Sequence, residues 1–87
     1  MQEIQVVVQL EQGLHARPAS LFVKTAASYA SEISLRKDGK GVNGKSIIGV
    51  MSLAIASGDS VTLTADGADA REALAALEAL LAKADAG

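Results

Sequence analysis

The chain has 87 residues, a formal net charge of −2 and no cysteine, and 49 % of its residues are hydrophobic. This length fits one domain over residues 1–87, and the lack of cysteine excludes disulfides, thiol catalysis and zinc-finger sites. Basic residues predominate in 1–45 and acidic residues in 46–87, which argues against general nucleic-acid binding. Neither a signal peptide nor an apolar run near about 18 residues is recognised, so we expect a cytoplasmic protein without membrane insertion.

The hydrophobic pattern of the first half predicts two strands, a helix and a hairpin. Apolar and polar residues alternate in the first strand, whose apolar positions are Ile4, Val6, Val8 and Leu10. Apolar residues then recur at helical spacing, at Ala19, Phe22, Val23, Ala26 and Ala30. Ile33 and Leu35 begin a second strand, and Asp38–Gly39 predicts a hairpin turn into a short third strand.

The second half predicts a short helix, a fourth strand and a final helix. Ser46 precedes the apolar run IIGVMSLA, and we expect that helix to end near Ser57–Gly58. The fourth strand alternates at Val61, Leu63 and Ala65. Asp69 and Glu72 have the spacing of a capping box at the start of the last helix. The inner face of that helix would carry Ala70, Ala73, Leu74, Leu77, Leu80, Leu81 and Ala84.

The predicted order is β-α-β-β-α-β-α. Four alternating strands and three amphipathic helices favour one sheet with the helices on one face, which is a two-layer α+β domain. The other face of such a sheet would meet water, which suits its Gln and Thr positions.

The stretch GLHARPAS, residues 13–20, holds the only histidine and the only proline of the chain. We expect His15 at or next to the N-cap of the first helix, with Pro18 in the first turn, where its missing N–H costs nothing. The first N–H groups of a helix have no intrahelical partner and favour an anion. Arg17 adds a guanidinium suited to phosphate. The stretch therefore predicts an anion site beside a histidine.

The residues alone leave several roles open for His15. An unperturbed histidine is roughly three-quarters neutral at pH 7, so its ring can accept a phosphoryl group without further activation. An ordinary capping or surface histidine is the simpler interpretation. A metal site is disfavoured because the chain has no second histidine and no cysteine. A small enzyme with His15 as a base is disfavoured because so short a chain leaves little room for a pocket.

Ser46 is first of all a predicted N-cap of the short helix. That helix is apolar on nearly every side, and it is too short to bury all of its side chains under a sheet. We expect Val50 and Leu53 to face inward. The residues Ile47, Ile48 and Met51 would then face outward beside His15 as an exposed docking surface, the alternative being a fully buried helix.

GLHARPAS followed by FVKTA, with GKSIIGVMSLA later in the chain, resembles the histidine-containing phosphocarrier (HPr) family of the bacterial phosphoenolpyruvate:sugar phosphotransferase system. The resemblance implies an open-faced β-sandwich, a four-stranded antiparallel sheet with three helices. It also implies that His15 accepts a phosphoryl group on Nδ1 from enzyme I and passes it to IIA domains of sugar permeases, with Arg17 supporting the phosphoryl group. Ser46 matches the serine that HPr kinase/phosphorylase modifies in one branch of the family.

The resemblance further implies a monomeric carrier, not an enzyme, that needs no cofactor. Its partners would bind the helix after Ser46, and they include enzyme I, IIA domains and, in the kinase-regulated branch, a transcriptional regulator. Lys24 matches a basic position that could contact partners, whereas Ile48 stands where other members carry Met or Phe. Two alternatives remain: a corepressor modified at Ser46, whose known forms lack the histidine, and a carrier of the nitrogen-related branch, which the Ser46 motif disfavours.

Overall fold

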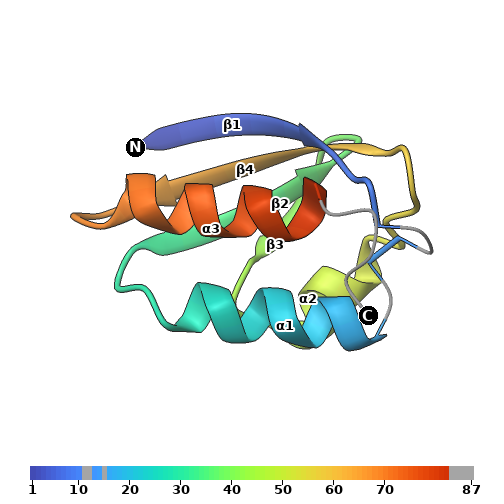
Figure 1. Ribbon diagram of the computed structural model, residues 1–87, viewed down its shortest axis with the longest axis horizontal. Helices are drawn as coiled ribbons and strands as arrows, with labels where there is room; N and C mark the ends of the chain where they lie inside the picture. The colour runs from blue at the N-terminus through green and yellow to red at the C-terminus, as the bar shows by residue number, and fades with distance from the viewer. Residues whose placement is uncertain (11–12, 15, 83–87) are drawn as a thin grey trace.

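The computed structural model describes residues 1–10, 13–14 and 16–82. The elements, shown in Figure 1, are β1 (Gln2–Val7), α1 (Ala16–Ala27), β2 (Glu32–Lys37), β3 (Lys40–Asn43), α2 (Ile47–Ser52), β4 (Ser60–Asp66) and α3 (Ala70–Ala82). This order confirms the predicted β-α-β-β-α-β-α arrangement. Among the described residues, no helix has the length and apolar character needed to cross a membrane.

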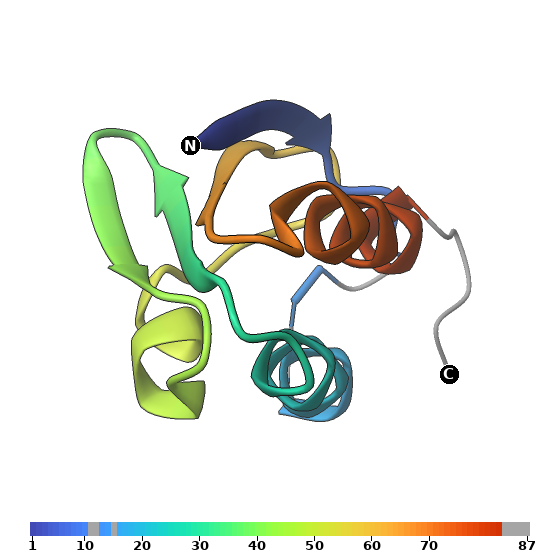
Figure 2. The ribbon, with the colours of Figure 1, turned by 90° about the vertical axis from the view of Figure 1, so that its left-hand side faces the viewer.

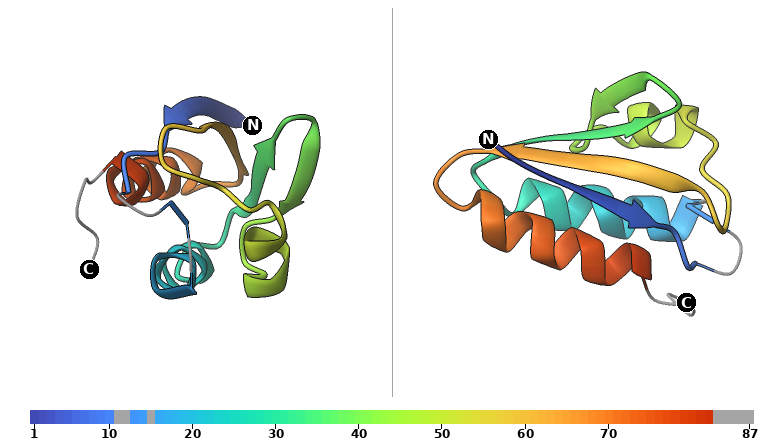
Figure 3. Two further views of the ribbon diagram at one scale, coloured as in Figure 1. Left: turned by 90° about the vertical axis from the view of Figure 1, so that its right-hand side faces the viewer. Right: turned by 90° about the horizontal axis from the view of Figure 1, so that it is seen from above.

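The four strands form one antiparallel sheet in the order β1-β4-β2-β3. In Figure 2 the three helices lie on the same side of this sheet, with α1 and α2 next to each other and α3 beneath β1 and β4. Figure 3 (right) shows the strands in front of the helices when the sheet is seen from above. The predicted α+β fold with helices on one face is therefore confirmed.

The core lies between the sheet and the helices, and its strand residues follow the predicted alternation. Leu63 of β4 pairs with Ile4 of β1 on one side and with Leu35 of β2 on the other. Both leucines are fully buried and pack against the inner faces of the helices. The helical core residues are Ala19, Phe22, Ala26, Val50, Ala70, Ala73, Leu74, Leu77 and Leu81.

The hairpin between β2 and β3 confirms the role predicted for Asp38–Gly39. Both residues have positive φ angles, 51° and 82°, as the tight turns that match strand twist require. Lys37 and Lys40 face each other across the base of this turn.

Two predicted boundaries are wrong by a few residues. β1 ends at Val7, which pairs with the first residue of β4, although Val8 and Leu10 are buried as the alternation predicted. Ala30 was placed on the inner face of α1, but it is exposed and lies beyond the helix end at Ala27. Ala84 lies outside the described residues.

The second helix also ends earlier than predicted. α2 stops at Ser52 rather than near Ser57–Gly58, because Ala54 adopts a left-handed conformation with φ 49°. The turn at Ser57–Gly58 is a separate one, with Gly58 at φ 89°. Residues 53–59, between α2 and β4, belong to no helix or strand, but the Gly58 N–H donates to the Val8 oxygen and the Val8 N–H to the Asp59 oxygen, both at 2.8 Å.

Asp69 does not form the capping box predicted with Glu72. Its carboxylate instead accepts hydrogen bonds from the backbone N–H groups of Ala30 and Ser31, at 2.8 and 2.9 Å, and from the Ser31 hydroxyl. Within the described residues no side-chain hydrogen bond joins it to Glu72. The start of α3 is thereby tied to the loop after α1.

The Asp69 tether predicts a specific pH dependence of stability. The Ser31 hydroxyl and then the Ala30 N–H lower the pKa of Asp69 below its usual value of 3.8. A lowered folded-state pKa contributes stability that is present above the unfolded pKa and is lost as pH falls through the folded one. We expect D69N to melt several degrees lower than the wild type at neutral pH, and this difference in Tm should shrink as pH falls below the usual carboxyl value of 3.8.

Thermal unfolding from neutral pH down to strongly acidic pH measures this gap. D66N is the matched control, because Asp66 is exposed and its one ion pair, with the N-terminus, spans 3.8 Å. A Tm difference between D69N and the wild type that stays constant over the whole pH range would contradict the role of Asp69 in tying α3 to this loop.

Candidate functional site

The chain just before α1 is held by the segment that follows α2. The Leu14 N–H donates to the carbonyl oxygen of Ile55 at 2.9 Å, and the Leu14 side chain is buried. Gly13 has φ 73°, and a Cβ there would lie 2.4 Å from the Ile55 oxygen. Glycine is therefore required at this approach. His15 lies outside the described residues, and α1 begins directly after it.

Arg17 and Pro18 occupy the first turn of α1, as predicted. Pro18 is buried and Arg17 is exposed. The first turn has no acidic residue, and no carboxylate of the described residues lies within ion-pair distance of Arg17. A cation at a helix N-terminus opposes the helix dipole. The position of Arg17 thus gives no benefit to helix stability, but it suits the binding of an external anion.

Lys24 lies at the opposite end of α1 from Arg17, where its charge stabilises the helix. It is exposed and lies in the last turn of α1, where a cation is favourable for the helix dipole. Helix stability alone explains a lysine at this position, so its proposed contact with partners remains a prediction.

Ser46 is the N-cap of α2, as the sequence predicted. Its backbone is extended, with φ −111° and ψ 115°, and its hydroxyl oxygen accepts a hydrogen bond from the Gly49 N–H at 3.2 Å. The residue is partly exposed. Removal of such a cap typically costs about 1 kcal/mol. A structural role for Ser46 is therefore established by geometry, and its modification remains a prediction.

The two faces of α2 are divided as expected. Val50 is fully buried and Leu53 is 6 % exposed. The exposed residues are Ile47, Ile48 and Met51, at 36 %, 81 % and 44 %. We call these three residues the α2 patch. A partly buried helix with an apolar outer face confirms the inward and outward assignment, and the binding of partners by the patch remains a prediction.

One further exposed apolar residue, Leu21, was missed by the sequence interpretation. It is 41 % exposed on α1, the helix that packs next to α2. Leu21 follows Arg17 by four residues and precedes Lys24 by three, so all three share one helical face. This spacing was the signal that could have identified it.

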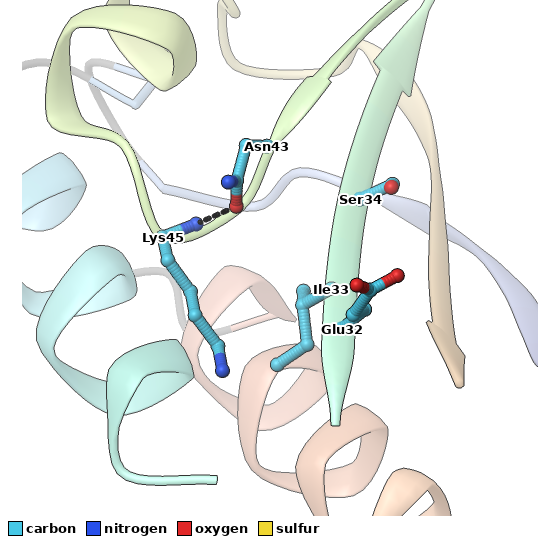
Figure 4. Close-up of a pocket in the computed structure, with 5 residues that line it drawn as sticks. All are labelled: Glu32, Ile33, Ser34, Asn43 and Lys45. Carbon is cyan, nitrogen blue, oxygen red and sulfur yellow. Dashed lines mark hydrogen bonds between the residues drawn. The ribbon is translucent and has the colours of Figure 1, made fainter. Parts of the chain in front are cut away.

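A recess of about 310 Å³ lies where β2 and β3 meet the turn before α2 (Figure 4), and it is lined by Glu32, Ile33, Ser34, Asn43 and Lys45. The Lys45 N–H donates to Asn43 Oδ1 at 2.9 Å, and the Lys45 ammonium donates to the Tyr29 carbonyl at 2.8 Å. The Lys45 ammonium and the Asn43 side chain therefore already have hydrogen-bond partners. None of the predicted site residues lines this recess.

Comparison with known proteins identifies relatives along nearly the whole chain. The family model for the PTS HPr component phosphorylation site matches residues 2–83. HPr-like protein Crh of Halalkalibacterium halodurans is 55 % identical over 83 residues, which cover 95 % of this chain and 99 % of the relative. The crystal structure of the phosphocarrier protein HPr from Bacillus anthracis matches with a TM-score of 0.90 at 51 % identity, over 92 % of this chain and 95 % of that one.

A third match bears on oligomeric state. The crystal structure of Crh from Bacillus subtilis matches with a TM-score of 0.77 at 49 % identity, over 98 % of each chain, and that protein forms a dimer with a swapping domain. This finding does not support the expectation of a monomer.

The family match contains both motif-bearing segments, and the solved relatives share the sheet and its three helices. The chain therefore belongs to the HPr family of phosphocarrier proteins of the phosphotransferase system.

Proposed function

We propose that this protein is a cytoplasmic, single-domain phosphocarrier that accepts a phosphoryl group from phospho-enzyme I on Nδ1 of His15. It then transfers the group to IIA domains of sugar permeases. The observation that carries the proposal is the position of His15, directly before the first turn of α1 and inside a family match named for its phosphorylation site. The protein acts as a substrate of other proteins rather than as an enzyme, and it needs no cofactor.

The start of α1 supplies the groups that this reaction needs. As the Nδ1–P bond forms, the bond between phosphorus and the donor breaks, and the three phosphoryl oxygens keep their negative charge. The N–H groups of Ala16 and Arg17 have no intrahelical acceptor and can donate to those oxygens. The exposed Arg17 guanidinium adds a permanent charge-assisted donor. These donors would hold the phosphoryl group in position, and they do not need to make the His15 imidazole more reactive.

The proposal is tested with enzyme I and labelled phosphoenolpyruvate. We expect the chain to take up a label that is lost in acid, as phosphohistidine loses its phosphate while phosphoserine retains it. Ser46→Ala should keep the label and His15→Ala should lose it. Acid-stable label, or label that persists in His15→Ala, would contradict the proposal.

The α2 patch and Leu21 are proposed as the docking surface for enzyme I and IIA domains. These four apolar residues lie on two adjacent helices, and each is between 36 % and 81 % exposed. Soluble proteins rarely leave such residues grouped without a binding role. Lys24, on the same face of α1 as Leu21, adds a charge at the rim of this surface.

Met51→Asp tests the docking surface. We expect the Kd for enzyme I to rise about tenfold or more, because a charge would enter an apolar contact. The Tm should change little, since Met51 is already 44 % exposed. Val7→Asp is the matched control, because Val7 is 49 % exposed on β1 and gains the same charge. Equal weakening by both substitutions, or a large loss of Tm in Met51→Asp, would refute the assignment.

Ser46 is proposed as a regulatory phosphorylation site for HPr kinase/phosphorylase. A phosphate at this N-cap would lie at the positive end of α2, where negative charge is tolerated. It would also place a charge of about −1.5 to −2 next to the α2 patch. Regulation would therefore act through repulsion of acidic groups on enzyme I.

Purified phospho-Ser46 protein distinguishes repulsion from unfolding. We expect a slower phosphoryl transfer from enzyme I and a Tm that is not lower than that of the unmodified protein. Higher salt should recover part of the rate, because it screens exposed charges. An unchanged rate, or a Tm well below that of the unmodified protein, would rule this mechanism out.

A second candidate is a regulator of the Crh type that acts only through Ser46. It is favoured by the 55 % identity to an HPr-like protein Crh. Regulators of this type lack the histidine, so the presence of His15 supports phosphoryl transfer as the principal role. A carrier of the nitrogen-related branch also keeps the histidine, and the Ser46 motif favours the sugar branch over it.

A further inference from the structure

One lysine from the hairpin binds both ends of the segment between α2 and β4, whose last residues also exchange two backbone hydrogen bonds with Val8 at 2.8 Å. The ammonium of Lys37, at the end of β2, lies 2.8 Å from Asp59 Oδ2. It also donates to the carbonyl oxygens of Leu53 and Ala54, at 3.4 and 3.1 Å. The two charged side chains are only 19 % and 30 % exposed. Lys37 thus binds the C-terminal end of α2 and the start of β4 at once.

Asp59 also binds Ala56, in the middle of the segment. Its Oδ2 atom accepts the Ala56 N–H at 2.8 Å, while the Asp59 N–H donates to the Ala56 carbonyl at 3.1 Å. Lys37 first, and then the Ala56 N–H, lower the pKa of the Asp59 carboxyl, so the group is charged at neutral pH. Residues 53–59, which belong to no helix or strand, are therefore bound by Lys37 at both ends, in addition to the bonds of Gly58 and Asp59 to Val8.

This fastened segment is the surface on which the chain before α1 rests. The Leu14 N–H binds the Ile55 oxygen, and a Cβ on Gly13 would lie 2.7 Å from Ala56 Cα. The backbones at Gly13 and Ala56 are thus in direct contact. Any movement of residues 55–56 must move Gly13–Leu14, and the next residue in the sequence is His15.

We propose that Lys37 and Asp59 are a positioning pair that fixes Ile55–Ala56 and, through Gly13–Leu14, sets the rate of phosphoryl transfer at His15. The proposal rests on the proposed function for its kinetic part and on geometry alone for its structural part. Ordinary surface ion pairs contribute little to stability. The predicted effect is therefore local, at one segment, rather than a general loss of stability.

Hydrogen exchange of the Leu14 amide tests the structural part. Lys37→Gln removes the cation, whereas Asp59→Asn keeps an acceptor for the Ala56 N–H and removes only the charge. Lys40→Gln is the matched control, because Lys40 is exposed, pairs with Lys37 across the hairpin and makes the same change in net charge. We expect Leu14 to exchange about tenfold faster in the first two variants, relative to the Leu63 amide of the central strand, and unchanged in the control.

Lys37→Arg should restore slow exchange at Leu14, because arginine keeps the charge and the donors. Leu14 exchange that is unchanged in Lys37→Gln and Asp59→Asn would overturn the proposal. So would an equal acceleration at Leu14 and Leu63, because that pattern reports global unfolding.

Steady-state phosphorylation by enzyme I tests the kinetic part. We expect kcat to fall about three- to tenfold in Lys37→Gln and Asp59→Asn with KM within about twofold, because small displacements near a reacting group slow the reaction. An unchanged kcat would show that the pair has no role in phosphoryl transfer. A raised KM alone would show that the pair acts in docking, and either result would overturn the proposal. If the wild type takes no acid-labile phosphate, the proposed function fails, and Leu14 exchange still decides whether the pair holds the segment.

Discussion

The close contact between Gly13–Leu14 and Ile55–Ala56 joins two parts of the chain that are far apart in sequence. One part leads into α1 and the other leaves α2. A single hydrogen bond and the absence of a side chain at Gly13 bring their backbones together. The start of α1, with Arg17, and the exposed patch of α2 consequently belong to one end of the molecule. The proposed phosphoryl site and the proposed docking surface would then serve the same partner.

The site is built from helix ends rather than from a pocket. At the start of α1, Arg17 opposes the helix dipole and no acidic residue of the first turn neutralises it. At the start of α2, Ser46 satisfies an N–H group by itself. The first N–H groups of α1 have no acceptor within the helix, whereas the start of α2 is capped by Ser46, the residue that a kinase would modify in our proposal. This difference fits a phosphoryl group that is carried transiently at the start of α1 and a regulatory phosphate at the start of α2.

Features that depend on neighbours in sequence were predictable. The alternation in β4, the turn at Asp38–Gly39 and the Ser46 cap each rest on a few adjacent residues, and all three are confirmed. The division of α2 into faces followed from its length, because a helix of six residues has too little inner surface for all of its apolar side chains.

Features that depend on distant partners were not predictable. Asp69 has the spacing of a capping box, but its carboxylate binds the loop at Ala30 and Ser31, which are 39 and 38 positions away. The early end of α2 follows from the left-handed Ala54, whose carbonyl binds Lys37. No local pattern marks either contact. Leu21 is different, because its helical spacing to Arg17 and Lys24 was present in the sequence.

The central claim is that the phosphoryl group resides on one ring nitrogen of His15. Nitrogen-15 and phosphorus NMR of the protein phosphorylated by enzyme I measures this most directly, because the two ring nitrogens give distinct couplings to phosphorus and to ring protons. We expect one phosphorus signal, coupled to Nδ1 of the single histidine. A phosphorus signal coupled to Nε2, or one that resides on a serine oxygen, would contradict it.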